Sequence, residues 1–244
     1  MPKHRRSRSS GPGLRIALVM VLVIAALGIG YVIGDNADDD GQDVSSGSTS
    51  STSPTTSTST SLPSADIATA VWPFVDSDTR YTDPVEAARG FATEFVGFKE
   101  PTVGPFQQGD SRSGEVEVRT KISTPTTVFV RLMSDDTWWV LGSATADIVV
   151  DEPTTDEIVT SPLSLSGRAR AYEGTVNVEV REDGSNEPIG EGFVTGSGGA
   201  DLGTFEGEVT FSEPTQTHGS LVFVTYSAED GRINEAGVMR IRFR

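Results

Sequence analysis

Residues 175–181, Thr-Val-Asn-Val-Glu-Val-Arg, alternate between valine and polar side chains. Successive side chains of a β-strand point to opposite faces of the sheet, so this stretch predicts a strand with one buried face and one polar face. Turn sequences such as Glu182-Asp183-Gly184 separate it from six further strand patterns, at residues 157–160, 163–170, 189–195, 204–211, 220–227 and 238–243. Seven short strands without a helix pattern predict an all-β immunoglobulin-like sandwich over residues 153–244.

A helix is predicted upstream, beginning at Asp83-Pro84-Val85-Glu86. Aspartate caps a helix, proline is favoured at the first helical position, and glutamate three residues after the cap completes the pattern. An apolar stripe with spacings of three and four residues follows and ends at Gly97; it comprises Val85, Ala88, Phe91, Ala92, Phe95 and Val96. This stripe predicts one helix with one buried face.

After a loop rich in glycine and proline, alternating patterns predict strands at residues 115–122, 128–132, 138–143 and 147–150. Short turns separate them, which favours an antiparallel meander with the helix across one face, a small α+β domain over residues 67–152. Trp138 and Trp139 are adjacent in one strand and therefore point to opposite faces, so we expect core packing rather than ligand stacking. Acids, proline and threonine at residues 151–155 place the domain boundary near Pro153.

The N-terminal 34 residues carry five basic residues and no acid, and residues 16–34 are an uncharged run. At about 1.5 Å per residue, a helix over this run is roughly 28 Å long, close to the hydrocarbon thickness of a bilayer. The basic tail at residues 1–15 and the acids after the run predict a single-pass transmembrane helix with the N-terminus in the cytoplasm. A cleaved secretory signal with a poor site at Gly28 and Gly30 is the alternative, and it exports the same domains.

The same run contains Ala26, Gly30 and Gly34 at four-residue spacing. On a helix these small residues share one face, which would permit homodimerisation of the membrane anchor. Residues 35–66 lack hydrophobic periodicity, and 16 of the 20 residues from 45 to 64 are serine or threonine. Such a segment buries too little apolar surface to fold and predicts a disordered stalk, either O-glycosylated or bare.

Composition restricts the chemistry. The net charge of -16 argues against nucleic acid as a partner, and the absence of cysteine excludes disulfides, thiolate metal sites and thiol catalysis. The only histidines are His4, in the basic tail, and His218, in a sequence typical of a turn, so a histidine-based triad or zinc site is not expected.

Two motif-like stretches are incomplete. Asn36, Asp38, Asp40 and Gly41 imitate the start of a calcium loop, but the twelfth position is Gly47 instead of glutamate. Residues 196–199, Gly-Ser-Gly-Gly, lack the strand–loop–helix setting of a phosphate site and predict a hairpin tip. We therefore expect no catalytic, cofactor-binding or metal-binding residues.

Six stretches in the C-terminal segment carry a family resemblance: Thr160-Ser161-Pro162, Ser166-Gly167-Arg168-Ala169, Tyr172-Glu173-Gly174-Thr175-Val176, Gly203-Thr204-Phe205, Val209-Thr210-Phe211 and Ser227-Ala228-Glu229-Asp230-Gly231. In this order they resemble the immunoglobulin-like domain of bacterial spore germination, also called Gmad2, over about residues 155–244. The resemblance implies an extracytoplasmic sandwich of Gram-positive envelope proteins, without catalytic residues or a cofactor. Residues 67–152 resemble regions that precede this domain in actinobacterial envelope proteins, and no activity follows from that.

Together these features predict a non-enzymatic envelope protein, anchored in the cell membrane, whose extracytoplasmic immunoglobulin-like domain binds or scaffolds a cell-wall polymer or another envelope protein. The alternative from a different class is a cell-wall glycan hydrolase that uses carboxylates of the 67–152 domain. The absence of a usable histidine or cysteine favours the first hypothesis.

Overall fold

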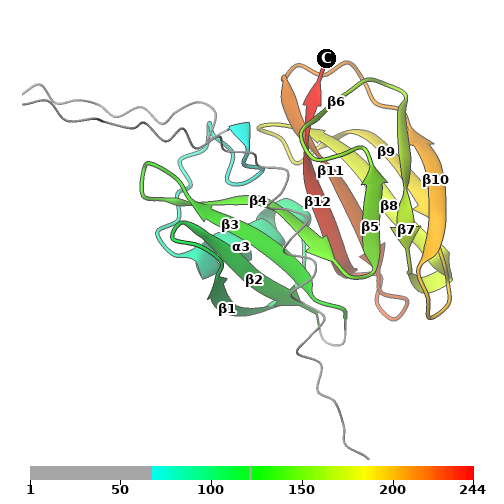
Figure 1. Cartoon of the computed structure of the whole chain (residues 1–244), viewed down its shortest axis with the longest axis horizontal. Coiled ribbons are helices and arrows are strands. Elements are labelled where there is room, and N and C mark those ends of the chain that lie inside the picture. Colours follow the sequence, from blue (N-terminus) through cyan, green and yellow to red (C-terminus); the bar gives the residue numbers. More distant parts are fainter. Residues whose placement is uncertain (1–67, 121–122) are drawn as a thin grey trace, which may run out of the picture. The chain divides into compact units, whose positions relative to one another are not determined.

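The computed structural model describes residues 68–120 and 123–244 (Figure 1), which fall in one compact unit. The predicted tail, transmembrane helix and stalk, with the candidate residues His4, Ala26, Gly30 and Gly34 and the calcium-like stretch, lie outside the described residues. Within the described part, no helix is long and apolar enough to cross a bilayer. In chain order the helical elements are α3 (Pro84–Gly90), the π-helix η2 (Phe91–Val96) and the 3₁₀ turn η3 (Tyr172–Gly174).

Twelve strands make up the rest of the described fold. They are β1 (Thr102–Gln108), β2 (Ser113–Arg119), β3 (Thr126–Leu132), β4 (Trp138–Thr145), β5 (Ile148–Glu152), β6 (Glu157–Val159), β7 (Leu163–Ala169), β8 (Thr175–Glu182), β9 (Pro188–Thr195), β10 (Gly203–Val209), β11 (His218–Tyr226) and β12 (Ile233–Phe243).

The predicted helix start is confirmed. Asp83 Oδ1 accepts hydrogen bonds from the backbone N–H groups of Val85 and Glu86 at 2.8 and 3.0 Å. The chain then continues as η2, a π-helical stretch that the apolar spacing did not predict. Gly97 ends it with a φ of 96°, and its N–H donates to the Ala92 carbonyl at 3.0 Å. Glycine is favoured here because other residues pay a steric cost in the left-handed region.

Strands β1 to β4 form an antiparallel meander, in which β2, β3 and β4 were predicted, and α3 lies across one of its faces (Figure 1). Strand β1 corrects the sequence analysis, which treated its residues as loop. Gly104 and Pro105 lie where the register between β1 and β2 shifts, and β1 pairs only with β2. An edge strand tolerates proline because one side of its backbone has no strand to bond.

The seven predicted strands of the C-terminal segment are all present, and β12 begins earlier than predicted, at Ile233. Strands β12, β11, β8 and β9 form one antiparallel layer, while β5, β7 and β10 form the facing one. The alternating valines Val176, Val178 and Val180 point into the core between these layers, as predicted. The C-terminal segment is thus an antiparallel β-sandwich.

The segments on either side of Pro153 share a sheet and a core. Strand β4 pairs with β12 through Ser143 and Val238, and Ser143 Oγ donates to the Ala236 carbonyl at 3.0 Å. Strand β5, predicted as the fourth strand of the α+β domain, pairs with β4 at Thr145 and Ile148 and also with β7 of the sandwich. That each segment folds independently stays a prediction.

One apolar cluster joins the helix to the meander and to strands β11 and β12. The buried faces of α3 and η2 contact the meander valines, and the same cluster includes Val222, Val224, Ala236 and Val238 from β11 and β12. The helix therefore packs between the meander and the outer face of the sandwich. Trp139 is fully buried in β4, and Trp138 is half-buried and packs against Phe106, so both rings take part in packing. That neither stacks on a ligand stays a prediction.

Candidate functional site

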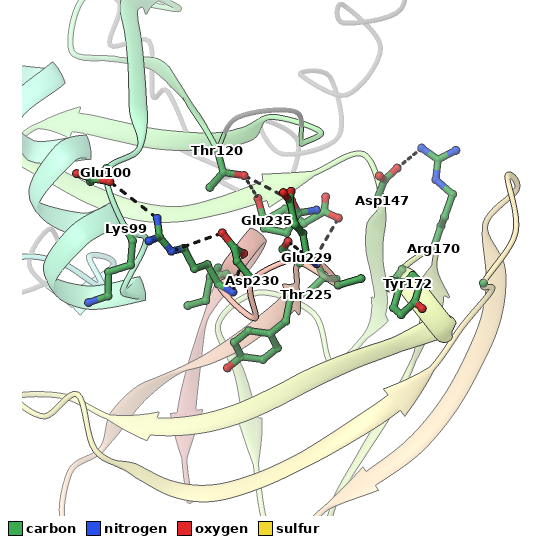
Figure 2. Close-up of a pocket in the computed structure, with 18 of the residues that line it drawn as sticks. Lys99, Glu100, Thr120, Asp147, Arg170, Tyr172, Thr225, Glu229, Asp230 and Glu235 are labelled. Atoms are coloured by element: carbon green, nitrogen blue, oxygen red, sulfur yellow. Dashed lines mark hydrogen bonds and ion pairs between the residues drawn. The ribbon is translucent and has the colours of Figure 1, made fainter.

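An open cavity of about 530 Å³ lies beside the turn between β11 and β12 (Figure 2). Figure 2 shows Asp147, Arg170 and Tyr172 on one side of it and Lys99 and Glu100 on the other. Its lining comes from four segments: the end of the helix, the β4–β5 corner, the segment after β7 and the β11–β12 hairpin. The charged lining residues are Lys99, Glu100, Asp147, Arg170, Glu229, Asp230, Arg232 and Glu235.

Glu235 of β12 is the deepest of these groups, with 3% of its surface exposed. Thr145 Oγ1 of β4 donates a hydrogen bond to its Oε2, and Thr225 Oγ1 of β11 donates to its Oε1 at 3.2 Å. Because both oxygens accept hydrogen bonds from different strands, the carboxyl group ties β4, β11 and β12 together.

The surroundings of Glu235 disfavour its charged form. Burial raises the pKa of Glu235 to about 7, and the negative charge of Asp147 acts in the same direction. The hydrogen bonds from Thr145 and Thr225 and the positive charge of Arg170 lower the pKa and only partly offset the effect of burial. This carboxyl group therefore changes its protonation near neutral pH.

Asp147 is a second buried carboxylate, at the corner between β4 and β5. Its Oδ2 accepts a hydrogen bond from Thr124 Oγ1 at 2.6 Å, and its Oδ1 forms an ion pair with Arg170. The Arg170 guanidinium also donates to the Ala200 carbonyl, and the Arg170 N–H donates to the Asp147 carbonyl at 2.8 Å. These contacts hold the corner against the segment that follows β7.

The rim of the cavity is more exposed. Arg232 lies 3.8 Å from a Glu100 oxygen and 3.5 Å from an Asp230 oxygen, and such surface pairs contribute little to stability. Two tyrosines add aromatic surface: Tyr172 is 66% exposed and Tyr226 42% exposed. The cavity thus combines a sealed polar floor with an open rim of aromatic and acidic side chains.

Sequence reasoning missed the two buried carboxylates, although a signal for Glu235 exists. Met239 and Ile241 of β12 point toward the sandwich core, and the two-residue period of a strand places Glu235 on the same face. A glutamate at a core-facing position of a strand indicates a buried polar group that needs partners. Asp147 carries no comparable signal, because it lies in a turn between strands.

The sequence candidates inside the described residues do not form a site. His218 is the first residue of β11, its Nδ1 lies 2.9 Å from Thr217 Oγ1, and it is not among the cavity-lining residues. The predicted hairpin tip at residues 196–199 is wrong, because β9 and β10 pair with different strands and lie in different layers. Ser197 instead forms an isolated parallel β-bridge with Arg170. Gly198 and Gly199 line the cavity.

Metal binding finds no support in the described part of the chain, where no group of three or more acidic or histidine side chains is placed to hold an ion. The cavity's acids are spread around its rim and floor, and several are already engaged by arginine or threonine. What the arrangement offers chemically is a polar and aromatic surface together with one carboxyl group that titrates near neutrality.

The C-terminal sandwich consists of the layers β12-β11-β8-β9 and β5-β7-β10, and the cavity lies at the end of the β11–β12 hairpin. Residues 147–232 match Gmad2, the immunoglobulin-like domain of bacterial spore germination. The resemblance expected from the sequence motifs is confirmed, with the match covering residues 147–232 rather than about 155–244. The Gmad2 match therefore includes β5, Asp147, Arg170 and the turn residues Glu229 and Asp230. No curated protein and no solved structure matches the chain.

Proposed function

We propose that this chain is a non-enzymatic envelope protein, anchored by residues 16–34, whose Gmad2 segment binds or scaffolds other envelope components outside the cell. The observation that carries the proposal is the Gmad2 match over residues 147–232, since an immunoglobulin-like domain of this family suggests binding rather than catalysis. The uncharged run and the basic tail before it support the anchor and its orientation.

The cavity supports binding because its rim remains available. Tyr172 and Tyr226 keep large exposed rings there, whereas the floor is closed by hydrogen bonds among Thr145, Thr225 and Glu235. Exposed aromatic side chains beside charged groups are typical of protein interaction surfaces.

The alternative of a glycan hydrolase names carboxylates of residues 67–152, which include Asp147. Glu235 lies outside that segment but also bears on this alternative, because its raised pKa is what a general acid needs. Their packing argues against this role. Both Glu235 oxygens accept threonine hydrogen bonds, and Asp147 is held by Arg170 and Thr124, so neither carboxyl is presented to a glycosidic oxygen. A structural role for the pair fits these contacts better.

Two measurements test the proposal. Protease added to intact cells without an outer membrane should degrade the folded part of the full chain, and protection equal to that of a cytosolic marker would overturn the predicted topology. Purified protein incubated with peptidoglycan should release no reducing sugar. Release that is abolished by Glu235→Gln, with the variant still folded, would establish the hydrolase instead.

A further inference from the structure

The sandwich face that continues from the cavity rim across β8 and β9 carries an unusual set of side chains. In register, Asn177 of β8 lies between Val224 of β11 and Phe193 of β9. Two residues further along, and therefore on the same face, Glu179 of β8 lies directly opposite Glu191 of β9. We call the surface formed by Asn177, Glu179, Glu191, Phe193 and Tyr226 the β8–β9 face.

Two like charges meet on this face. Side chains directly opposite in an antiparallel pair have Cβ atoms about 4.5–5.5 Å apart, and like charges at such positions destabilise the sheet. The nearby cation is Arg181, whose Nε and Nη2 both donate to Glu179 Oε2, at 2.8 and 2.5 Å. In the described part of the chain, Glu191 has no ion pair of its own.

Arg181 cannot also serve Glu191, because its remaining contacts hold it against the helix. Its Nη1 donates to the Phe95 carbonyl at 2.6 Å, and its guanidinium carbon lies 5.1 Å from the Phe95 ring centroid. With 8% of its surface exposed, Arg181 is buried in place. The negative charge of Glu191 therefore stays uncompensated on the exposed side of the pair.

Aromatic rings adjoin this charge. Phe193, two residues from Glu191 on the same side of β9, is 65% exposed, and Tyr226 is 42% exposed. Burial and the charge of Glu179 raise the pKa of Tyr226, Arg181 lowers it, and Glu191 raises it. A carboxylate beside exposed rings is the chemistry that receives a cation, through an ion pair and cation–π contact.

We propose that the β8–β9 face binds lysine or arginine side chains of a basic segment of a partner protein. The cation would lie between Glu191 and the ring of Phe193, with Asn177 available to bond the partner backbone and Tyr226 of β11 adding exposed aromatic surface nearby. This inference rests on the proposed binding function and names its partner chemistry.

The charge of the whole folded part agrees with this choice of partner. From residue 68 onward the sequence has 29 acidic and 14 basic residues, so an anionic polymer would be repelled and a basic segment attracted. A neutral glycan could stack on the same rings, but it would leave the charge of Glu191 uncompensated.

The test uses the purified full-length chain and a capped peptide of alternating glycine and lysine, titrated by calorimetry at low and physiological ionic strength. We expect saturable binding that weakens with salt and is lost when the lysines are acetylated. Phe193→Ala and Glu191→Gln should each weaken binding by about three- to fivefold, as expected for one cation–π contact or one surface ion pair.

Matched control variants separate a site from diffuse attraction. Glu208→Gln removes an exposed acid from β10 in the other layer, and Ile158→Ala removes an exposed apolar side chain from β6; both should change the affinity by less than about twofold. Equal losses in control and site variants would overturn the proposal, as would equal binding of the acetylated peptide or no binding. Binding of a chito-oligosaccharide that depends on Phe193, without peptide binding, would assign the face to glycan. Since the titration needs no cells, its failure is distinct from a failure of the envelope topology.

Discussion

Replacing Glu235 by glutamine should remove a fall in stability that the native protein shows as the pH rises toward neutrality. The carboxyl has a pKa of about 7 in the folded protein against an ordinary value of 4.5. The folded state therefore holds the proton more tightly than the unfolded chain does. Its stabilising contribution is complete below about pH 4.5 and is lost as the pH rises to 7 and beyond.

The expected size follows from the same values. Since one pKa unit corresponds to about 1.4 kcal/mol, ionisation of Glu235 costs the folded state about 3 kcal/mol above roughly pH 8. Glutamine keeps the shape and carries no charge, and the threonine hydroxyls can reverse to accept from its amide group. The free energy of unfolding of Glu235→Gln, relative to the native protein, should thus rise by about 3 kcal/mol from pH 4.5 to pH 8.

Urea unfolding of the full chain, followed by tryptophan fluorescence, to which the buried Trp72 and Trp139 contribute, measures this difference at each pH. Glu208→Gln serves as the control, because it removes the same charge from an exposed position on β10. A Glu235→Gln difference that does not change with pH would refute the reasoning, since it would mean that the buried carboxyl ionises at its ordinary pKa.

Three further predictions concern local features. Asp83→Ala removes the cap that accepts from Val85 and Glu86 and should lower the free energy of unfolding by about 1 kcal/mol, whereas the same change at the exposed Asp78 should have little effect. Gly97→Ala places a side chain at a φ of 96° and should lower the free energy of unfolding in urea by about 1–2 kcal/mol; an unchanged midpoint would contradict the left-handed backbone conformation of Gly97. In a membrane reporter of self-association, Gly30→Ile should weaken the signal while a substitution at Val32 should not, and equal signals from native and Gly30→Ile spans would indicate a monomeric anchor.

Local chemistry made much of the fold readable from the sequence. The start of α3 depends on Asp83 and Pro84, which act on backbone groups within one turn, and the end depends on the conformation open to Gly97. The strands of the sandwich follow from two-residue alternation, as at Val176 and Val178, because that period is a property of the extended backbone itself. The family resemblance also rests on short stretches in a fixed order, and the Gmad2 match confirms it.

What the sequence left undecided depends on contacts between distant residues. Strand β1, with Gly104 and Pro105, forms because β2 supplies an edge to pair with. The uninterrupted apolar run at residues 221–224 of β11 is buried on both faces because the helix covers one of them, and a short apolar run alone does not name the covering element.

The candidate site also depends on contacts between residues that are distant in the sequence. The pKa of Glu235 is raised because this residue of β12 is buried against β4 and β11. The charge of Asp147, which is 88 positions away in the chain, acts in the same direction. The Glu179–Glu191 pair depends on the register of β8 and β9, and a shift of one residue would place Glu191 opposite a different side chain. The sequence by itself determined the elements and their faces, because these depend on neighbouring residues, whereas the tertiary structure decided which charges and rings meet, because pairing and burial depend on the whole chain.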